Sequence, residues 1–291
     1  MPKEVLFKLV DVTKKFGKAI VLDKINLEIP PRKIFGIIGP SGAGKTTLLR
    51  LLVTFYTPSK GKIYFGGEKL KWKKIRHLIS MSAQHGSFYP NLTVEQNIAF
   101  FGKLYGLSKD MIKRKALPLL KELELYDKRN IAASALSKGM QKRLDIICTL
   151  LPNAEIFIFD EPMEDLDPLL REKVVKIIKK LHKQGKSIII CSHFFKELEE
   201  LCEEIIMLYK GKIIEAGSLE EIEEKYGHLN LEKIFFEIVR KKKFEEKVEE
   251  KRREKERVKE KFKEKFKLNR IINWFKKKLK RQKSAEAKEE E

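Results

Sequence analysis

The stretch Gly39-Pro40-Ser41-Gly42-Ala43-Gly44-Lys45-Thr46-Thr47 constrains the fold of this chain more than any other part of it. An apolar run, Ile34–Ile38, precedes it, and a leucine-rich segment, residues 48–52, follows it. A glycine, four free positions and then Gly-Lys-Thr between a strand and a helix form the pattern of a phosphate-binding loop. Glycines let backbone N–H groups turn toward a phosphate chain, and the helix start adds the positive end of its dipole. The sequence therefore predicts an α/β fold that binds a nucleoside triphosphate.

The loop pattern assigns chemistry to three of its side chains. Lys45 is expected to reach the β- and γ-phosphates, and the Thr46 hydroxyl is expected to ligate Mg²⁺. Thr47 is expected only to support the helix start. The alternative, a glycine-rich turn that carries a lysine by chance, does not account for the strand and helix on either side of it.

A second apolar run, Ile156–Phe159, ends in Asp160 and Glu161. Such a continuous run is typical of a parallel strand that is covered on both faces, and open α/β sheets bind ligands at the carboxyl ends of these strands. Asp160 is therefore expected to hold the Mg²⁺ shell, and Glu161 to polarise the attacking water. A third apolar run, Ser187–Cys191, brings His193 to the same edge, although a lone histidine is more often structural.

The remaining segments divide the chain. Val5–Val10 and Ile20–Ile29, joined by residues 11–18, predict a small antiparallel sheet. The pattern is helical from Asn91 to Leu151, with Ser137 as the N-cap of the last helix there. Phe16 lies in the joining segment, where its ring either stacks on a purine or packs in the core.

Composition and charge indicate which kind of partner and which cellular location to expect. The chain has 291 residues and a formal net charge of +21, which favours an anionic partner such as nucleic acid or a lipid surface. No apolar stretch approaches the roughly 20 residues that cross a bilayer, and no secretory signal is evident at the start, so a cytoplasmic protein is expected. Cys148, Cys191 and Cys202 are widely spaced in apolar surroundings, which predicts buried thiols.

With these motifs in this order, residues 5–226 resemble the nucleotide-binding subunit of an ATP-binding cassette (ABC) transporter. The resemblance implies an α/β ATPase cassette with a mixed core sheet, an antiparallel β subdomain and a helical subdomain, followed by a charged helical C-terminal extension. It divides the chain into an ATP-binding core of residues 1–90 and 152–226, a helical subdomain of residues 91–151, and an extension of residues 227–291.

The resemblance also implies a role for each motif. Phe16 matches the aromatic residue that stacks on adenine, and Gln84 matches the glutamine that contacts Mg²⁺ and the γ-phosphate. Gly39–Thr47 matches the Walker A loop, Asp160 and Glu161 match the Walker B aspartate and the catalytic glutamate, and His193 matches the switch histidine. In that family two cassettes sandwich ATP head to tail, so Ser137 and Gly139 of the signature and Asp167 of the D-loop are expected to act at a shared site.

Two motifs depart from the usual family pattern. The signature reads Leu-Ser-Lys-Gly-Met, with Lys138 and Met140 where Leu-Ser-Gly-Gly-Gln is usual. The D-loop reads Met163-Glu164-Asp165 where Thr-Ser-Gly is common. This form of signature is similar to that of exporter cassettes whose membrane subunit is a separate polypeptide.

The resemblance implies an ATPase that binds ATP and Mg²⁺ and pairs with a second copy or a paralogous cassette. It further implies that the protein powers an integral membrane permease from the cytoplasmic face, as an exporter. An importer cassette fits less well. The rival of a different class is a soluble ABC-type ATPase that acts on nucleic acid or the ribosome, for which the basic charge is the main argument. Members of the translation-factor type carry two phosphate loops and this chain has one, which disfavours a nucleic-acid partner.

The basic charge is concentrated at the C-terminus, where residues 240–291 carry 23 Lys/Arg and 12 Asp/Glu. Two apolar stripes at helical spacing run through this tail. Around the second stripe, Leu268 to Leu279, lie six basic residues and Trp274, a pattern of helices that lie on an anionic membrane surface. A solvated charged helix or a disordered tail remains the alternative.

Overall fold

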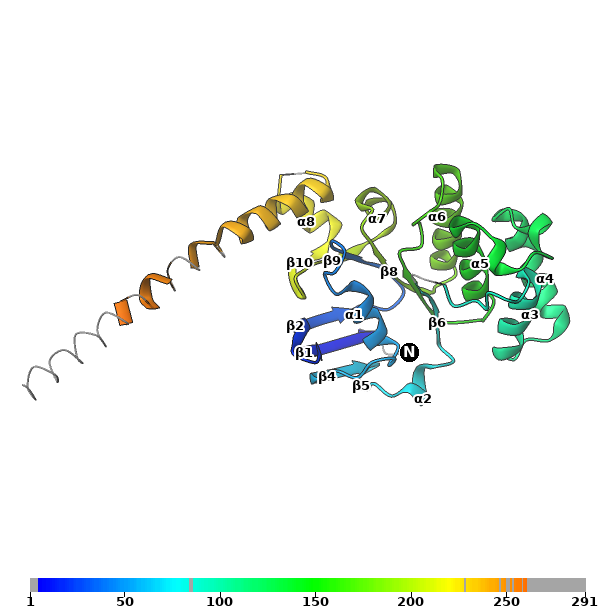
Figure 1. Ribbon diagram of the computed structural model, residues 1–291, viewed down its shortest axis with the longest axis horizontal. Helices are drawn as coiled ribbons and strands as arrows, with labels where there is room; N and C mark the ends of the chain where they lie inside the picture. Colours follow the sequence, from blue (N-terminus) through cyan, green and yellow to red (C-terminus); the bar gives the residue numbers. More distant parts are fainter. Residues whose placement is uncertain are drawn as a thin grey trace, which may run out of the picture. The chain divides into compact units, whose positions relative to one another are not determined.

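The computed structural model describes residues 5–83, 86–227, 229–245, 247–249, 252, 254–257 and 259–260. The chain divides into two compact units between Phe235 and Phe236, and the strands found among the described residues belong to the first unit (Figure 1). In the second unit, residues 236–245 and 247–249 are helical. The second apolar stripe of the tail lies outside the described residues.

Among its described residues the first unit contains ten strands, eight numbered helices and two short 3₁₀ turns, and residues 231–235 are helical as well. The strands are β1 (Phe7–Phe16), β2 (Ala19–Ile29), β3 (Ile34–Ile38), β4 (Lys60–Phe65), β5 (Glu68–Lys69), β6 (Ile79–Ser82), β7 (Ile156–Asp160), β8 (Ser187–Ser192), β9 (Glu204–Tyr209) and β10 (Lys212–Ser218). The helices are α1 (Lys45–Leu52), α2 (Trp72–Ile75), α3 (Val94–Leu104), α4 (Lys109–Glu122), α5 (Lys138–Leu150), α6 (Pro168–Lys183), α7 (Phe195–Leu201) and α8 (Leu219–Lys225), and the turns are Tyr126–Lys128 and Ala133–Ala135.

The larger sheet has the strand order β10-β9-β3-β8-β7-β6. It is parallel from β6 to β9, and β10 pairs antiparallel with β9. Every residue of β3, β7 and β8 is buried, as expected for central strands that are covered on both faces. The carboxyl ends of these three strands therefore meet at one edge, which is where the sequence predicts the site.

The smaller sheet is antiparallel, with the order β2-β1-β4-β5. The sequence pattern ended the first strand at Val10, and that boundary is wrong because β1 continues to Phe16. Asp11 has a φ of 48°, and the pairing with β2 shifts in register between Leu9 and Val12. A bulge of this kind breaks the alternation that marks a strand in the sequence while the strand itself continues.

Helix α1 packs in the core that both sheets share. Leu48, Leu49, Leu51 and Leu52 are all fully buried, together with side chains from β1, β2, β3, β7, β8 and β9. Burial of each leucine contributes about 1.5–3 kcal/mol, so α1 and the loop before it are held firmly on the sheet. Helices α3, α4 and α5 gather on the side of this unit away from the smaller sheet (Figure 1). The mixed sheet, the antiparallel sheet and this helical region confirm the predicted fold class.

Candidate functional site

The phosphate loop occupies the turn between β3 and α1. Gly42 and Gly44 have φ angles of 77° and 108°, which side chains other than glycine rarely adopt. A Cβ on Gly39 would lie 2.3 Å from the Leu208 carbonyl oxygen on β9, so the chain can pass β9 here only as glycine. The spacing of glycines in the sequence thus corresponds to the places where the loop turns and where it touches the sheet.

Lys45, the first residue of α1, is buried with 7% of its side chain exposed. Its Nζ donates to the Gly39 carbonyl oxygen at 2.8 Å and lies 3.0 Å from Oε1 of Glu161. The Glu161 side chain is only 4% exposed. A buried ammonium therefore stands against a buried carboxylate at the end of β7, across the mouth of the loop.

Glu161 is held from two further directions. Its φ of 52° lies in the left-handed region, and its backbone N–H donates to the Cys191 carbonyl oxygen at 2.9 Å. Oε2 accepts a hydrogen bond from the backbone N–H of His193 at 3.1 Å and lies 2.8 Å from Nδ1 of the His193 ring. The β7 and β8 ends thus bring Glu161 and His193 into direct contact, and an unusual backbone conformation of this kind is common at functional sites.

The Asp160 carboxylate lies in a different environment from that of Glu161. Oδ1 accepts from the Cys191 thiol at 2.6 Å, while Oδ2 is buried and has no hydrogen-bond partner among the described residues. Burial, and next the adjacent Asp160 carboxylate, raise the pKa of the Cys191 thiol well above its usual range, so the thiol remains protonated and donates. A buried carboxylate oxygen without a partner normally indicates a missing cation or water.

This oxygen fits a magnesium ion. Mg²⁺ prefers carboxylate and hydroxyl oxygens and is commonly bound by one or two protein groups together with substrate phosphates. Thr46 lines the pocket at the loop mouth, whereas Asp160, at the end of β7, is not among the residues that line it. No group of three or more acidic, histidine or cysteine side chains that would hold a metal without a phosphate occurs within the described part of the chain.

One pocket collects most of the predicted site residues. It is lined by Pro40–Thr47, Glu161 and His193, together with two residues for which the sequence predicted no binding role, Val21 and Glu164. Gly39 forms the base of the loop through its contact with Lys45. Glu164 belongs to the D-loop segment that departs from the family pattern, but the sequence does not predict that its side chain lies at this pocket.

Phe16 lies outside the lining of this pocket, on a separate aromatic cluster. Its ring is 41% exposed and meets Tyr56 edge-on at a centroid distance of 5.1 Å. Lys14 Nζ lies 4.9 Å from both ring centroids. Because Phe16 keeps an open face, it is not the core aromatic that was one of its two predicted interpretations. Its pairing with Tyr56, 40 positions away, could not be read from the sequence.

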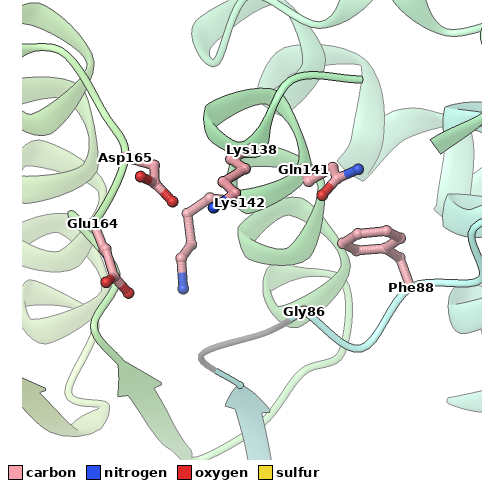
Figure 2. A pocket seen from close by; sticks show the side chains of 7 residues that line it. All are labelled: Gly86, Phe88, Lys138, Gln141, Lys142, Glu164 and Asp165. Carbon is pink, nitrogen blue, oxygen red and sulfur yellow. The ribbon is translucent and has the colours of Figure 1, made fainter. Parts of the chain in front are cut away.

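Two residues of the signature segment, Lys138 and Gln141, line a second pocket, which shares Glu164 with the first. Ser137 caps α5, with Oγ accepting from the Met140 N–H at 3.3 Å, as the sequence predicts. Lys138 and Lys142 of α5 lie opposite Glu164 and Asp165 across this pocket, whereas the Gln141 amide points away from these carboxylates and donates to the Ala133 carbonyl oxygen at 3.0 Å (Figure 2). Gly139 packs so closely on the D-loop that a Cβ there would lie 2.5 Å from the Asp165 carbonyl oxygen.

Two of the predicted site residues remain, Asp167 and Gln84. Asp167 caps α6, where its Oδ1 accepts from the Leu170 N–H at 3.0 Å. Its side chain therefore has a structural partner at the end of the D-loop. Gln84 lies outside the described residues, so its predicted contact with Mg²⁺ stays a prediction.

A glycine-rich loop that opens a helix beside a parallel sheet, with a lysine, an acidic pair and a histidine at the loop mouth, defines a nucleotide-binding ATPase. The family model described as ABC transporter matches residues 22–164. The Nod factor export ATP-binding protein I of Cupriavidus metallidurans is 32% identical over 75% of this chain and 72% of its own length. The ABC transporter ATP-binding protein YhaQ of Bacillus subtilis, which is uncharacterised, is 32% identical over 76% of this chain and 74% of its own length.

Solved structures give the same result. The ATP-binding subunit of an ABC transporter superposes with a TM-score of 0.74 at 25% identity, covering 80% of this chain and 99% of that structure. A dimeric bacterial ABC transporter cassette superposes with a TM-score of 0.67 at 30% identity, covering 74% of this chain and 99% of that one. The chain belongs to the ABC transporter ATP-binding proteins, and it is an ATPase subunit that binds and hydrolyses ATP in support of transport.

Proposed function

We propose that two such cassettes, two copies of this chain or one copy and a paralogous cassette, close around ATP and power export through a separate integral membrane subunit. The observation that carries this proposal is the division of the site into two pockets. The phosphate loop lines one pocket, and α5, which the signature begins, lines the other. In the proposed arrangement, one copy would supply the phosphate loop to one nucleotide and the start of α5 to the other.

Each predicted residue receives a role in this scheme. The backbone of Gly39–Thr47 and the Lys45 ammonium bind the phosphates, and the open face of Phe16 stacks on the base. Ser137 and Gly139 of the opposing copy close the site from the other side, and Asp167 lies at the junction between the copies. Asp160, Thr46 and Gln84 would hold Mg²⁺, which supplies neutralising charge to the phosphate oxygens.

The Lys45–Glu161 pair indicates how nucleotide binding prepares the site. The carboxylate of Glu161 lies 3.0 Å from Lys45 Nζ. Phosphate oxygens of ATP would compete with this carboxylate for Lys45, and Glu161 would then be free to accept a hydrogen bond from the attacking water. His193 keeps its two contacts with Glu161 Oε2 and fixes the direction of the carboxylate.

A rigid aromatic surface is suited to the membrane partner. Tyr89 is 49% exposed and packs on Phe100, which is 39% exposed, with ring centroids 4.7 Å apart. The loop that carries Tyr89 is fixed from below by fully buried Asn97, whose Oδ1 accepts from the Tyr89 N–H at 2.7 Å and whose Nδ2 donates to the Tyr89 carbonyl. Asp145 holds the same loop through the Ser87 N–H at 2.7 Å. Exposed aromatic side chains on a fixed backbone are typical of interfaces.

Two observations support a membrane partner and the direction of transport. The described residues include no helix that is both long and apolar enough to cross a membrane. The relatives include proteins named for Nod factor export, and a probable multidrug ABC transporter ATP-binding protein of Escherichia coli that is 32% identical over 76% of this chain. We place the protein at the cytoplasmic face of the membrane as the peripheral subunit of an exporter.

Copurification from native membranes tests this proposal. Affinity-tagged chain should bring down an integral membrane protein, and Tyr89→Ala together with Phe100→Ala should reduce its recovery. Met111→Ala is the matched control, because Met111 has the same 39% exposure as Phe100 and lies on α4. Recovery of ribosomes or DNA in place of a membrane protein would favour the soluble ATPase of the rival class.

We further propose that the basic tail, residues 240–291, contacts anionic lipid beside this partner. Each well-placed basic residue contributes about 1 kcal/mol to such binding. A chain that ends at Val239 should keep its ATPase activity and lose salt-sensitive binding to phosphatidylserine vesicles. Equal vesicle binding by the two chains would exclude the tail as a membrane contact.

A further inference from the structure

One arginine of α6 contacts both of the chain segments that carry the Glu161–His193 contact. Arg171 lies in the first turn of α6, and its side chain is 30% exposed. Its Nε donates to the Leu166 carbonyl oxygen at 2.9 Å, in the loop between β7 and α6 that begins with Glu161. Its guanidinium carbon lies over the Phe194 ring, 4.4 Å from the ring centroid, in the short connection between β8 and α7.

The Phe194 ring also contacts His193. The centroids of the two rings lie 4.2 Å apart, at an interplanar angle of 34°. The Phe194 N–H donates to Ser192 Oγ at 3.0 Å, which ties this connection to the end of β8. His193 Nδ1 in turn lies 2.8 Å from Glu161 Oε2. A guanidinium, a phenyl ring, an imidazole and a carboxylate are thus in consecutive contact from α6 to the phosphate pocket.

The Leu166 carbonyl is a group that α6 itself does not bond. The hydrogen-bond ladder of a helix begins with the carbonyl of its N-cap, and the N-cap of α6 is Asp167. Leu166 lies one residue earlier, and Arg171 Nε supplies the donor that its carbonyl would otherwise lack from the helix. The bond inside the loop, from the Leu166 N–H to the Met163 carbonyl, is long at 3.4 Å. Since the loop begins with a φ of 52° at Glu161, its shape depends on such outside contacts.

A guanidinium suits these contacts because it is planar and carries its donors at fixed angles. It lies over the Phe194 ring while Nε donates to Leu166. Its Nη1 donates to Glu197 Oε1 of α7 at 3.3 Å. A lysine ammonium would keep the charge and the attraction to Glu197, but it has no flat face and no second donor along its stem. The contacts with the loop and the ring therefore depend on the shape of arginine and not on its charge alone.

We propose that Arg171 is a positioning residue for ATP hydrolysis. Through the Phe194 ring it holds the His193 imidazole, and through the Leu166 carbonyl it holds the loop that begins with Glu161. The Glu161 carboxylate thereby keeps its orientation at the phosphate pocket. The inference rests on the roles proposed above for Glu161 and His193.

NMR of the full-length, nucleotide-free chain tests the positioning directly. The chain has five histidines, so a sample with isotope-labelled histidine gives few ring signals, and His193→Ala identifies the signal of His193. Arg171→Lys should shift or broaden this signal, because the ring loses its support. The variant keeps the positive charge, so such a change reports geometry. An unchanged His193 signal in a folded Arg171→Lys chain would overturn the proposal.

Two control variants distinguish positioning from a role that only fastens α6 to α7. Glu197→Gln removes the ion pair of Arg171 and keeps its other two partners. Lys179→Met removes another ion pair between the same helices, in which Lys179 Nζ lies 2.7 Å from a glutamate of α7. Both variants should keep the His193 signal and kcat near the wild-type values. If either one reproduces the effect of Arg171→Lys, Arg171 only fastens the helices and the proposal fails.

Steady-state ATPase kinetics tests the consequence. Arg171→Lys should lower kcat about 3–10-fold with little change in KM, as expected when a catalytic group is displaced and nucleotide binding is not. An unchanged kcat would refute the proposal. A loss that appears only in KM would place the effect on nucleotide binding and would refute it equally.

Phe194→Leu tests the same route if Arg171→Lys folds poorly. It removes the ring that both Arg171 and His193 contact, so it should lower kcat by a similar factor. The double variant should lose no more activity than the single ones, and losses that multiply would contradict a shared route. Full kcat in His193→Ala would refute the role proposed for His193, whereas the NMR comparison would still decide whether Arg171 holds that ring.

Discussion

Replacement of Glu161 by glutamine should destabilise the nucleotide-free protein. The substitution keeps the shape of the side chain but removes the carboxylate that lies 3.0 Å from Lys45 Nζ, and both groups are more than nine-tenths buried. Breaking a buried ion pair at one partner typically costs about 3–5 kcal/mol. Lys45 retains its bond to the Gly39 carbonyl oxygen at 2.8 Å, so we expect a smaller loss of about 2–3 kcal/mol.

Thermal unfolding measures this loss. For a unit of this size each kcal/mol lowers Tm by about 2–4 °C, so the expected decrease is about 5–10 °C. ADP supplies phosphate oxygens to Lys45 in place of the carboxylate, and the deficit should therefore shrink at saturating ADP. Lys45→Ala should lose nucleotide affinity and show no such recovery.

The control is Glu172→Gln. Glu172 forms an ion pair with Lys176 at 2.7 Å on the surface of α6, where both side chains are at least 60% exposed. Such pairs contribute about 0–1 kcal/mol, so this variant should melt close to the wild type. An unchanged Tm for nucleotide-free Glu161→Gln, or a deficit that ADP does not reduce, would refute the reasoning.

Two further predictions concern the structure around the site. Gly39→Ala should abolish ATP binding, because the new Cβ would lie 2.3 Å from the Leu208 carbonyl oxygen and would displace the phosphate loop. Normal ATP affinity of this variant, measured by calorimetry, would contradict the prediction. Burial favours the neutral form of Glu215, but hydrogen bonds from Lys225 and Tyr226 outweigh it and hold its pKa below the ordinary 4.5. Its stabilisation should therefore be present above pH 4.5 and lost as the pH falls through the lowered pKa, so Glu215→Gln should reduce Tm at neutral pH and lose this deficit in acid.

The sequence predicts the parts of this protein that have a local pattern. The phosphate loop, the buried strands β3, β7 and β8, and the serine cap of α5 each follow from residues that lie next to one another. The three cysteines are free and buried, which confirms their interpretation as thiols in apolar surroundings.

The sequence does not predict contacts between distant segments. The Lys45–Glu161 pair joins positions that are 116 residues apart, and the Phe16–Tyr56 contact joins the end of β1 to the loop after α1. The bulge at Asp11 conceals a continuing strand because it breaks the alternating pattern. The Lys138 and Asp165 replacements are visible in the sequence, but only the fold shows that they face one pocket.

Size measurement of Glu161→Gln with and without ATP tests the central claim most directly. The claim is that the phosphate loop and the signature of one copy line different pockets, so that ATP joins two copies. Light scattering coupled to size exclusion should show a monomer without nucleotide and a stable dimer with ATP, because the variant binds ATP and does not hydrolyse it. A monomer at saturating ATP, with ATP binding verified on the same sample, would contradict the account.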